Sequence, residues 1–159
     1  MRGVAILVGV VFLLAACGGS GSGTTTSAHL SAAEYRAQLV KIQQQSNQAQ
    51  AEVAQGLSAK TVAELRSRLD AFAASSQRIS HEVANLAAPE NATAANAELA
   101  KGEHDTATAT RAAAAAVAKM KTVHAAVAYL QHQLGNAKGG HELDEAVTKL
   151  KQLGYTSGS

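Results

Sequence analysis

The sequence predicts an all-α protein, an antiparallel helical bundle of three long, coiled-coil-like helices and one short C-terminal helix. Alanine supplies 36 of the 159 residues, and it has the highest helix propensity of all residues. Pro89 is the only proline, so long segments lack the residue that most strongly interrupts helices. Aromatic residues make up only 3% of the chain, whereas β-strands favour aromatic and β-branched side chains.

The first helix is predicted over residues 31–56. Ser31 and Glu34 have the spacing of a capping box, in which each residue satisfies a free backbone amide of the other. Apolar and small residues then recur at alternating spacings of four and three, which is typical of a coiled-coil seam. The seam residues are Tyr35, Leu39, Ile42, Ser46, Ala49, Val53 and Gly56.

The second helix is predicted over residues 61–86, where Thr61 and Glu64 form a second capping box. Its seam residues are Val62, Leu65, Leu69, Phe72, Ser76, Ile79, Val83 and Leu86. The connection between the two helices is short, which favours antiparallel neighbours. Ser46 and Ser76 both fall on seams, and we interpret them as packing positions rather than functional groups.

The third helix is predicted to be continuous over residues 92–134, about 65 Å long. Asn91 or Thr93 would cap it; the Asn91-Ala92-Thr93 sequon is interpreted in the same way. The seam repeats every seven residues, at Leu99, Thr106, Ala113, Met120, Val127 and Leu134 and at Ala109, Ala116, Val123 and Leu130. Residues 101–110 contain Gly102 and three threonines, so the sequence leaves open whether the helix is continuous there or has a kink or break.

A fourth helix is predicted from His141 to Leu153, after Gly135 and a flexible turn at Gly139-Gly140. The third helix would extend beyond the first two, and the fourth would fold back over that overhang. The expected result is a two-helix tip, defined as the end of the third helix with the fourth. Exposed apolar surface often marks interaction sites, so the tip is the predicted contact for a protein partner or for self-association.

The N-terminal sequence predicts a targeting signal that is cleaved off, rather than an internal helix or a membrane span. Arg2 precedes an uncharged run over residues 3–16. As a helix this run would be about 21 Å long, short of the roughly 30 Å hydrocarbon core of a bilayer. A run of this length after one positive charge is typical of a signal peptide.

The end of that run, Leu14-Ala15-Ala16-Cys17, resembles the lipobox of bacterial lipoproteins. The resemblance implies that the lipoprotein signal peptidase recognises Leu14, Ala15 and Ala16 and cleaves before Cys17. It also implies a diacylglyceryl group on the Cys17 sulfur, which would anchor the chain on the extracytoplasmic face of the cell membrane. An ordinary secretory signal with an incidental Cys17 is the alternative. Cys17 is the only cysteine, so a disulfide within one molecule is excluded.

The domain layout follows from these boundaries. Residues 1–16 are the signal peptide, 17–29 the lipidated cysteine with its tether, 30–154 the bundle and 155–159 a disordered tail. Residues 18–27 are all Gly, Ser or Thr, a composition typical of a flexible coil with a reach of about 16–19 Å. The alanine-rich heptads also loosely resemble uncharacterised small lipoproteins of high-GC bacteria, a likeness that implies no activity.

No residue pattern predicts catalysis or a cofactor. In Glu103-His104-Asp105 the three side chains point around a helix, so we interpret the stretch as solvated. His104, His124 and His132 are weak metal candidates, because a zinc site needs three or four ligands. A formal charge of +2 does not favour nucleic acid as a partner. The expected function is a non-enzymatic interaction or structural module; a small-molecule or metal-binding lipoprotein is the alternative.

Overall fold

The computed structural model describes residues 29–56, 58–134 and 138–156, and all regular structure in these ranges is helical. This confirms the predicted all-α class. The elements are α1 (Ala32–Gly56), α2 (Val62–Ala84), the short 3₁₀ segment η1 (Glu90–Ala92), α3 (Thr93–Val117), α4 (Val123–Leu134) and α5 (Lys138–Gln152).

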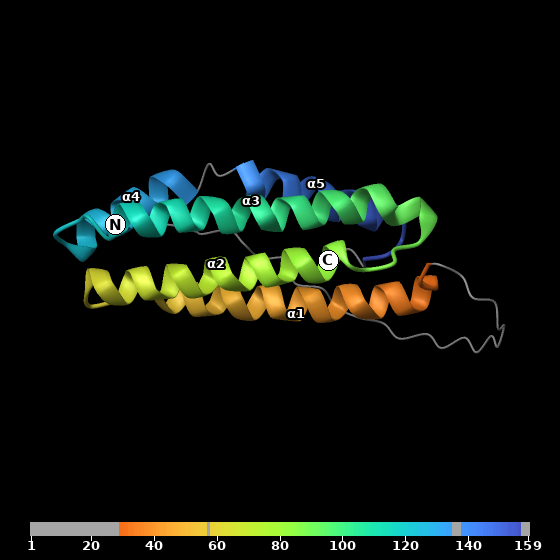
Figure 1. Ribbon diagram of the computed structural model, residues 1–159, viewed down its shortest axis with the longest axis horizontal. Helices are drawn as coiled ribbons and strands as arrows, with labels where there is room; N and C mark the ends of the chain where they lie inside the picture. Colours follow the sequence, from red (N-terminus) through yellow and green to blue (C-terminus); the bar gives the residue numbers. More distant parts are fainter. Residues whose placement is uncertain (1–28, 57, 135–137, 157–159) are drawn as a thin grey trace.

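The helices form an antiparallel bundle of four rods (Figure 1). α1 and α2 make two of the rods, and α3 makes the third. The fourth rod consists of α4 and α5, which follow one another along α3 and run in the opposite direction. α3 therefore packs against α2 on one side and against the α4–α5 rod on the other.

Local capping starts the first two long helices; the predicted capping box forms fully at the first and in part at the second. The Ser31 amide donates to the Glu34 carboxylate at 2.9 Å, and the Glu34 amide donates to the Ser31 hydroxyl at 3.3 Å. At the second helix, the Glu64 amide donates to Thr61 Oγ1 at 3.1 Å. There the Glu64 carboxylate accepts from the Lys60 amide, one residue before the partner that a capping box would use.

The prediction of one continuous helix over residues 92–134 is wrong. α3 ends at Val117, the chain turns over residues 118–122, and α4 runs back. The helix does not break within residues 101–110, where the sequence left a break open, because this stretch is helical throughout. Packing explains the difference: Thr110 is 1% exposed, and a Cβ at Gly102 would lie 2.9 Å from Leu143 Cγ on α5.

The predicted two-helix tip is not formed by the described residues. α4 covers the ends of α2 and α3 instead, where Ala126 and Leu130 pack with Leu65, Leu69 and Val117. α4 covers this end of the bundle because the chain reverses after Val117 and does not continue past the ends of α1 and α2.

α5 begins three residues earlier than predicted, at Lys138. Gly139 and Gly140 belong to its first turn, so the expected flexible turn at these two residues is wrong. Gly139 lies directly against α3, where a Cβ would approach Thr106 Oγ1 at 2.6 Å. The glycine is needed for this close approach of the two helices.

The predicted cap of the third helix is also wrong. The residue before α3 is Ala92, which has no capping side chain. Asn91 Oδ1 instead accepts a hydrogen bond from the Tyr155 hydroxyl at 2.8 Å, and Thr93 Oγ1 donates to the Pro89 carbonyl at 3.2 Å. Asn91 thus ties the C-terminal segment to the start of α3.

The bundle is slightly larger than predicted at both ends. Tyr155, assigned to the disordered tail, is 8% exposed and packs edge-to-face on Tyr35 with ring centroids 5.1 Å apart. His29, assigned to the tether, lies with its ring Nδ1 2.6 Å from the Ala88 carbonyl. Residues 18–27 and 157–159 lie outside the described residues.

Replacing Tyr155 with Phe tests the C-terminal attachment. The variant keeps the ring contact with Tyr35 and removes the hydrogen bond to Asn91, so the free energy of unfolding should fall by about 0.5–1.5 kcal/mol. Urea unfolding measures the change. Tyr129→Phe is the matched control, since the Tyr129 hydroxyl makes no hydrogen bond to a described residue, and it should be nearly neutral. Equal effects of both variants would contradict the attachment.

The buried apolar residues form two clusters. The first cluster lies where the chain enters the bundle and comprises Tyr35, Leu39, Ile42, Ile79, Val83, Ala88, Ala92, Ala95, Leu99, Ala100, Ala146, Leu150 and Tyr155. The second cluster lies at the opposite end and comprises Ala59, Leu65, Leu69, Ala113, Ala114, Val117, Ala126 and Leu130. α2 and α3 cross both clusters.

Candidate functional site: a buried polar layer

A polar layer separates the two apolar clusters. It consists of Ser46 on α1, Ser76 on α2 and Glu103 on α3. On each helix the polar residue follows or precedes a cluster residue by about one turn, so the three helices bring their polar groups to one level. The layer is the most unusual chemical feature of the described core, because the remaining acidic residues lie nearer the surface.

The Glu103 carboxyl group is held by hydroxyls from two other helices. Ser46 Oγ donates to Glu103 Oε1 at 3.0 Å, and Ser76 also hydrogen-bonds the carboxyl group. Glu103 is 6% exposed and Ser76 is 2% exposed. These contacts satisfy the buried oxygens, which would otherwise carry a large desolvation cost.

Burial raises the pKa of Glu103 above its ordinary value of 4.5, while the hydrogen bonds from Ser46 and Ser76 act in the opposite direction. Glu103 forms no ion pair with any described residue, so no cation offsets the burial of its charge. A buried carboxyl group without a cation partner favours the protonated form. The layer can therefore bind and release one proton inside the bundle.

A second buried polar network lies within the first cluster. The Tyr35 hydroxyl donates to Asn96 Oδ1 at 3.0 Å, and Asn96 Nδ2 donates to the Val83 carbonyl at 2.8 Å. Burial raises the pKa of Tyr35 to about 12, so its hydroxyl keeps its proton. The network ties α1, α2 and α3 together, and it leaves the Asn96 amide paired on both sides.

The structure corrects the interpretation of Glu103-His104-Asp105 as a solvated stretch. His104 is exposed and Asp105 pairs with Lys101 at 2.8 Å, but Glu103 is buried. Extended seven residues back from Ala109, the seam repeat places Gly102 rather than Glu103 at the interface. The signal that could have found Glu103 is the pair of small hydroxyl residues, Ser46 and Ser76, on two facing seams.

The metal candidates do not assemble into a site. His104, His124 and His132 are all exposed, the first on α3 and the others on α4. Within the described ranges, no three His, Cys, Asp or Glu side chains come close enough together to hold a metal ion. The lipobox positions Leu14, Ala15, Ala16 and Cys17 lie outside the described residues, and their roles stay predictions.

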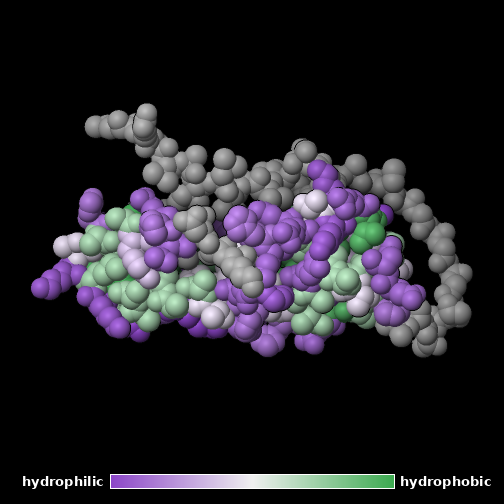
Figure 2. Space-filling model, turned by 90° about the horizontal axis from the view of Figure 1, so that it is seen from above, coloured by the Kyte–Doolittle hydropathy of each residue, from purple (hydrophilic) through white to green (hydrophobic). Residues whose placement is uncertain are grey.

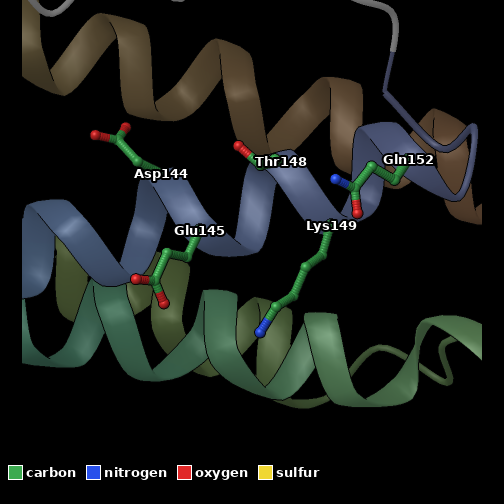
Figure 3. A pocket seen from close by; sticks show the side chains of 5 residues that line it. All are labelled: Asp144, Glu145, Thr148, Lys149 and Gln152. Carbon is green, nitrogen blue, oxygen red and sulfur yellow. The ribbon is translucent and has the colours of Figure 1, made fainter.

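A surface depression of about 340 Å³ lies along α5. Its lining residues are Asp144, Glu145, Thr148, Lys149 and Gln152. In Figure 3, Asp144 and Thr148 point toward α1, whereas Glu145 and Lys149 point toward α3. Lys149 is occupied by an ion pair with Glu98 at 2.6 Å. The polar groups diverge, so they do not form a set that could hold one small ligand.

The described surface carries few large apolar side chains. Hydrophilic and weakly hydrophobic residues are interspersed over the face in Figure 2, and Leu153, at 39%, is the only large hydrophobic residue of the described part counted as exposed. None of the described helices combines the length and the apolar character that a bilayer crossing requires. No known protein family, curated protein or solved structure matches this chain.

Proposed function

We propose that this chain is a lipid-anchored helical lipoprotein on the extracytoplasmic face of a bacterial membrane. The observation that carries the proposal is Leu14-Ala15-Ala16-Cys17 at the end of an uncharged run. The lipid on Cys17 would hold the bundle at the membrane, and the bundle would act as a non-enzymatic interaction or structural module. A diacylglyceryl group supplies the two acyl chains that stable anchoring requires.

The packing of the bundle supports separate roles for the lipid, which would anchor the chain, and for the bundle, which would make contacts. Its apolar residues are used internally in two clusters, so membrane attachment would depend on the covalent lipid. The chain enters the bundle at His29, next to Ala88 and the first cluster. The turn after α1 lies about 37 Å from that point, given a helix of 25 residues and a rise of 1.5 Å per residue. We infer that the end holding the second cluster faces away from the membrane.

Substitution of Cys17 tests the proposal. In a bacterial host fed a labelled fatty acid, the wild-type chain should acquire the label and sediment with membranes. Cys17→Ser should lose the label completely, because serine has no sulfur to acylate. Gly18→Ser is the matched control, since it alters the adjacent residue and leaves Leu14-Ala15-Ala16-Cys17 intact; it should be labelled normally. Label retained by Cys17→Ser would overturn the anchoring proposal.

A further inference from the structure

The turn between α3 and α4 contains neither glycine nor proline. Its last residue, Thr122, caps α4, because Thr122 Oγ1 accepts a hydrogen bond from the Ala125 amide at 3.2 Å. Residues 118–122 read Ala-Lys-Met-Lys-Thr, and Ala, Lys and Met are among the best helix formers. No described residue other than glycine has a positive φ, so no special backbone conformation fixes the turn. The local sequence is therefore compatible with a helix that continues through it.

The apolar repeat also continues through the turn. Ala109, Ala116, Val123 and Leu130 are spaced by seven, as they would be along one uninterrupted seam. A straight helix over residues 93–134 would be roughly 63 Å long. Beyond the local cap at Thr122, tertiary packing holds α4 back against the bundle, since Ala126 and Leu130 are 0% and 3% exposed in the second cluster.

We propose that residues 118–122 are the hinge of a domain swap between two copies of this chain. In the swapped dimer the hinge straightens, α3 and α4 become one helix, and the α4–α5 rod of each copy docks on α1–α3 of the other. Exchange of an identical element is a low-cost route to a dimer, because the interfaces are reused. The inference does not depend on a lipid anchor.

The contacts of the exchanged rod are suited to this reuse. α4 packs on Leu65, Leu69 and Val117, all of which belong to the α1–α3 body. α5 places Lys149 Nζ 2.6 Å from Glu98 Oε2, and Gly139 lies against α3. Every one of these contacts can form between copies as well as within one copy.

The hinge carries positive charge that opposes the dimer. Lys119 and Lys121 are exposed, and neither forms an ion pair with a described residue. Two straightened hinges would lie antiparallel and bring the lysines of both copies together. Like charges at short range repel, so removal of one lysine should raise the dimer fraction, by roughly twofold.

The native Glu98–Lys149 ion pair provides the test. Two full-length copies are expressed together in one bacterial host, one with Glu98→Gln and the other with Lys149→Gln. Each copy lacks one partner of the pair, so a carbodiimide can link Glu98 to Lys149 only when α5 of the first copy docks on α3 of the second. Mass spectrometry of the linked peptides detects that product. In the wild-type chain expressed alone, a Glu98–Lys149 link found in protein of monomeric mass is the same-chain link, which serves as a reference for folding.

Lys121→Pro and Lys121→Ala form the matched pair at the hinge. Both remove the same charge, and the Lys121 amide donates no hydrogen bond to a described residue, so proline removes no backbone hydrogen bond of the closed turn. Proline inside a helix breaks it; Lys121→Pro should therefore lower the linkage between copies about tenfold or more relative to Lys121→Ala. Lys119→Gly against Lys119→Ala repeats the comparison if Lys121→Pro loses the same-chain link.

The outcomes are distinct. Linkage between copies that is present in the wild-type hinge, higher with Lys121→Ala and lost with Lys121→Pro supports the swap. The proposal is overturned if the same-chain link forms and no linkage between copies appears in either the wild-type or the Lys121→Ala background. Equal linkage between copies for the proline and alanine variants would also overturn it, because the hinge would then not straighten.

Discussion

Replacing Glu103 with Gln should stabilise the folded protein at neutral and alkaline pH. The variant keeps the shape of the side chain and groups that can pair with Ser46 and Ser76, but it removes the charge that is buried without a cation. Because burial raises the pKa of Glu103, removing its charge should recover stability at high pH. Every gain of about 1 kcal/mol raises the midpoint of thermal unfolding by several degrees.

The sign of the pH dependence follows from the raised pKa of Glu103. Below pH 4.5, the ordinary value, the group is protonated in both the folded and the unfolded chain. As the pH rises further, the unfolded chain releases the proton first, so the wild-type free energy of unfolding falls relative to Glu103→Gln. The difference levels off once the pH exceeds the pKa of Glu103 in the folded chain.

Urea unfolding of both proteins between pH 4 and pH 9 measures this difference. Glu145→Gln is the matched control, because Glu145 is exposed on α5 and pairs with no described residue; it should not change the pH profile. If Glu103→Gln were less stable than the wild type at pH 8, the carboxylate would be stabilised by its layer, and the account of the buried acid would be wrong.

The second large effect is expected at Gly139. A Cβ there would lie 2.6 Å from Thr106 Oγ1, 2.7 Å from the Thr106 amide nitrogen and 3.0 Å from the Gly102 carbonyl oxygen. The last two are backbone atoms of α3, which cannot rotate away, so α5 must move outward. Gly139→Ala should lower the free energy of unfolding by about 1–3 kcal/mol, the usual cost of overpacking.

The neighbouring glycine supplies the control. A Cβ at Gly140 meets no atom within 4 Å, and alanine is a better helix former than glycine by up to about 1 kcal/mol. Gly140→Ala should therefore stabilise the protein while Gly139→Ala destabilises it. Chemical unfolding of the two variants measures the difference, and effects of the same sign would show that α5 does not approach α3 as closely as described.

The start and the buried face of α2 were predictable because their signals are local. Thr61 and Glu64 act within one helical turn, and every residue of the predicted α2 seam is buried or half-buried. The interface of α3 was harder to predict. α3 packs on two sides, so Ala107, Thr110 and Ala114 are buried as well, and a single seam does not describe it.

The candidate site was not predictable from spacing alone. Glu103 lies next to the seam position Gly102, and its burial depends on residues 57 and 27 positions away, Ser46 and Ser76. The residues next to each serine in the sequence do not indicate that it will face a carboxyl group. The lipobox at Cys17 is the opposite case, because its prediction rests on adjacent residues, and it stays a prediction.

The sequence by itself determined the helical class, the caps of α1 and α2 and the proposed targeting signal at Leu14-Ala15-Ala16-Cys17, because each depends on composition or on residues within one turn. Only the tertiary structure decided where the third helix ends. Residues 118–121 favour a helix locally. The chain reverses there because Thr122 caps α4 and, above all, because α4 buries Ala126 and Leu130 against the second cluster. Contacts between distant residues outweigh helix propensity at that point, which is also why the turn can serve as a hinge.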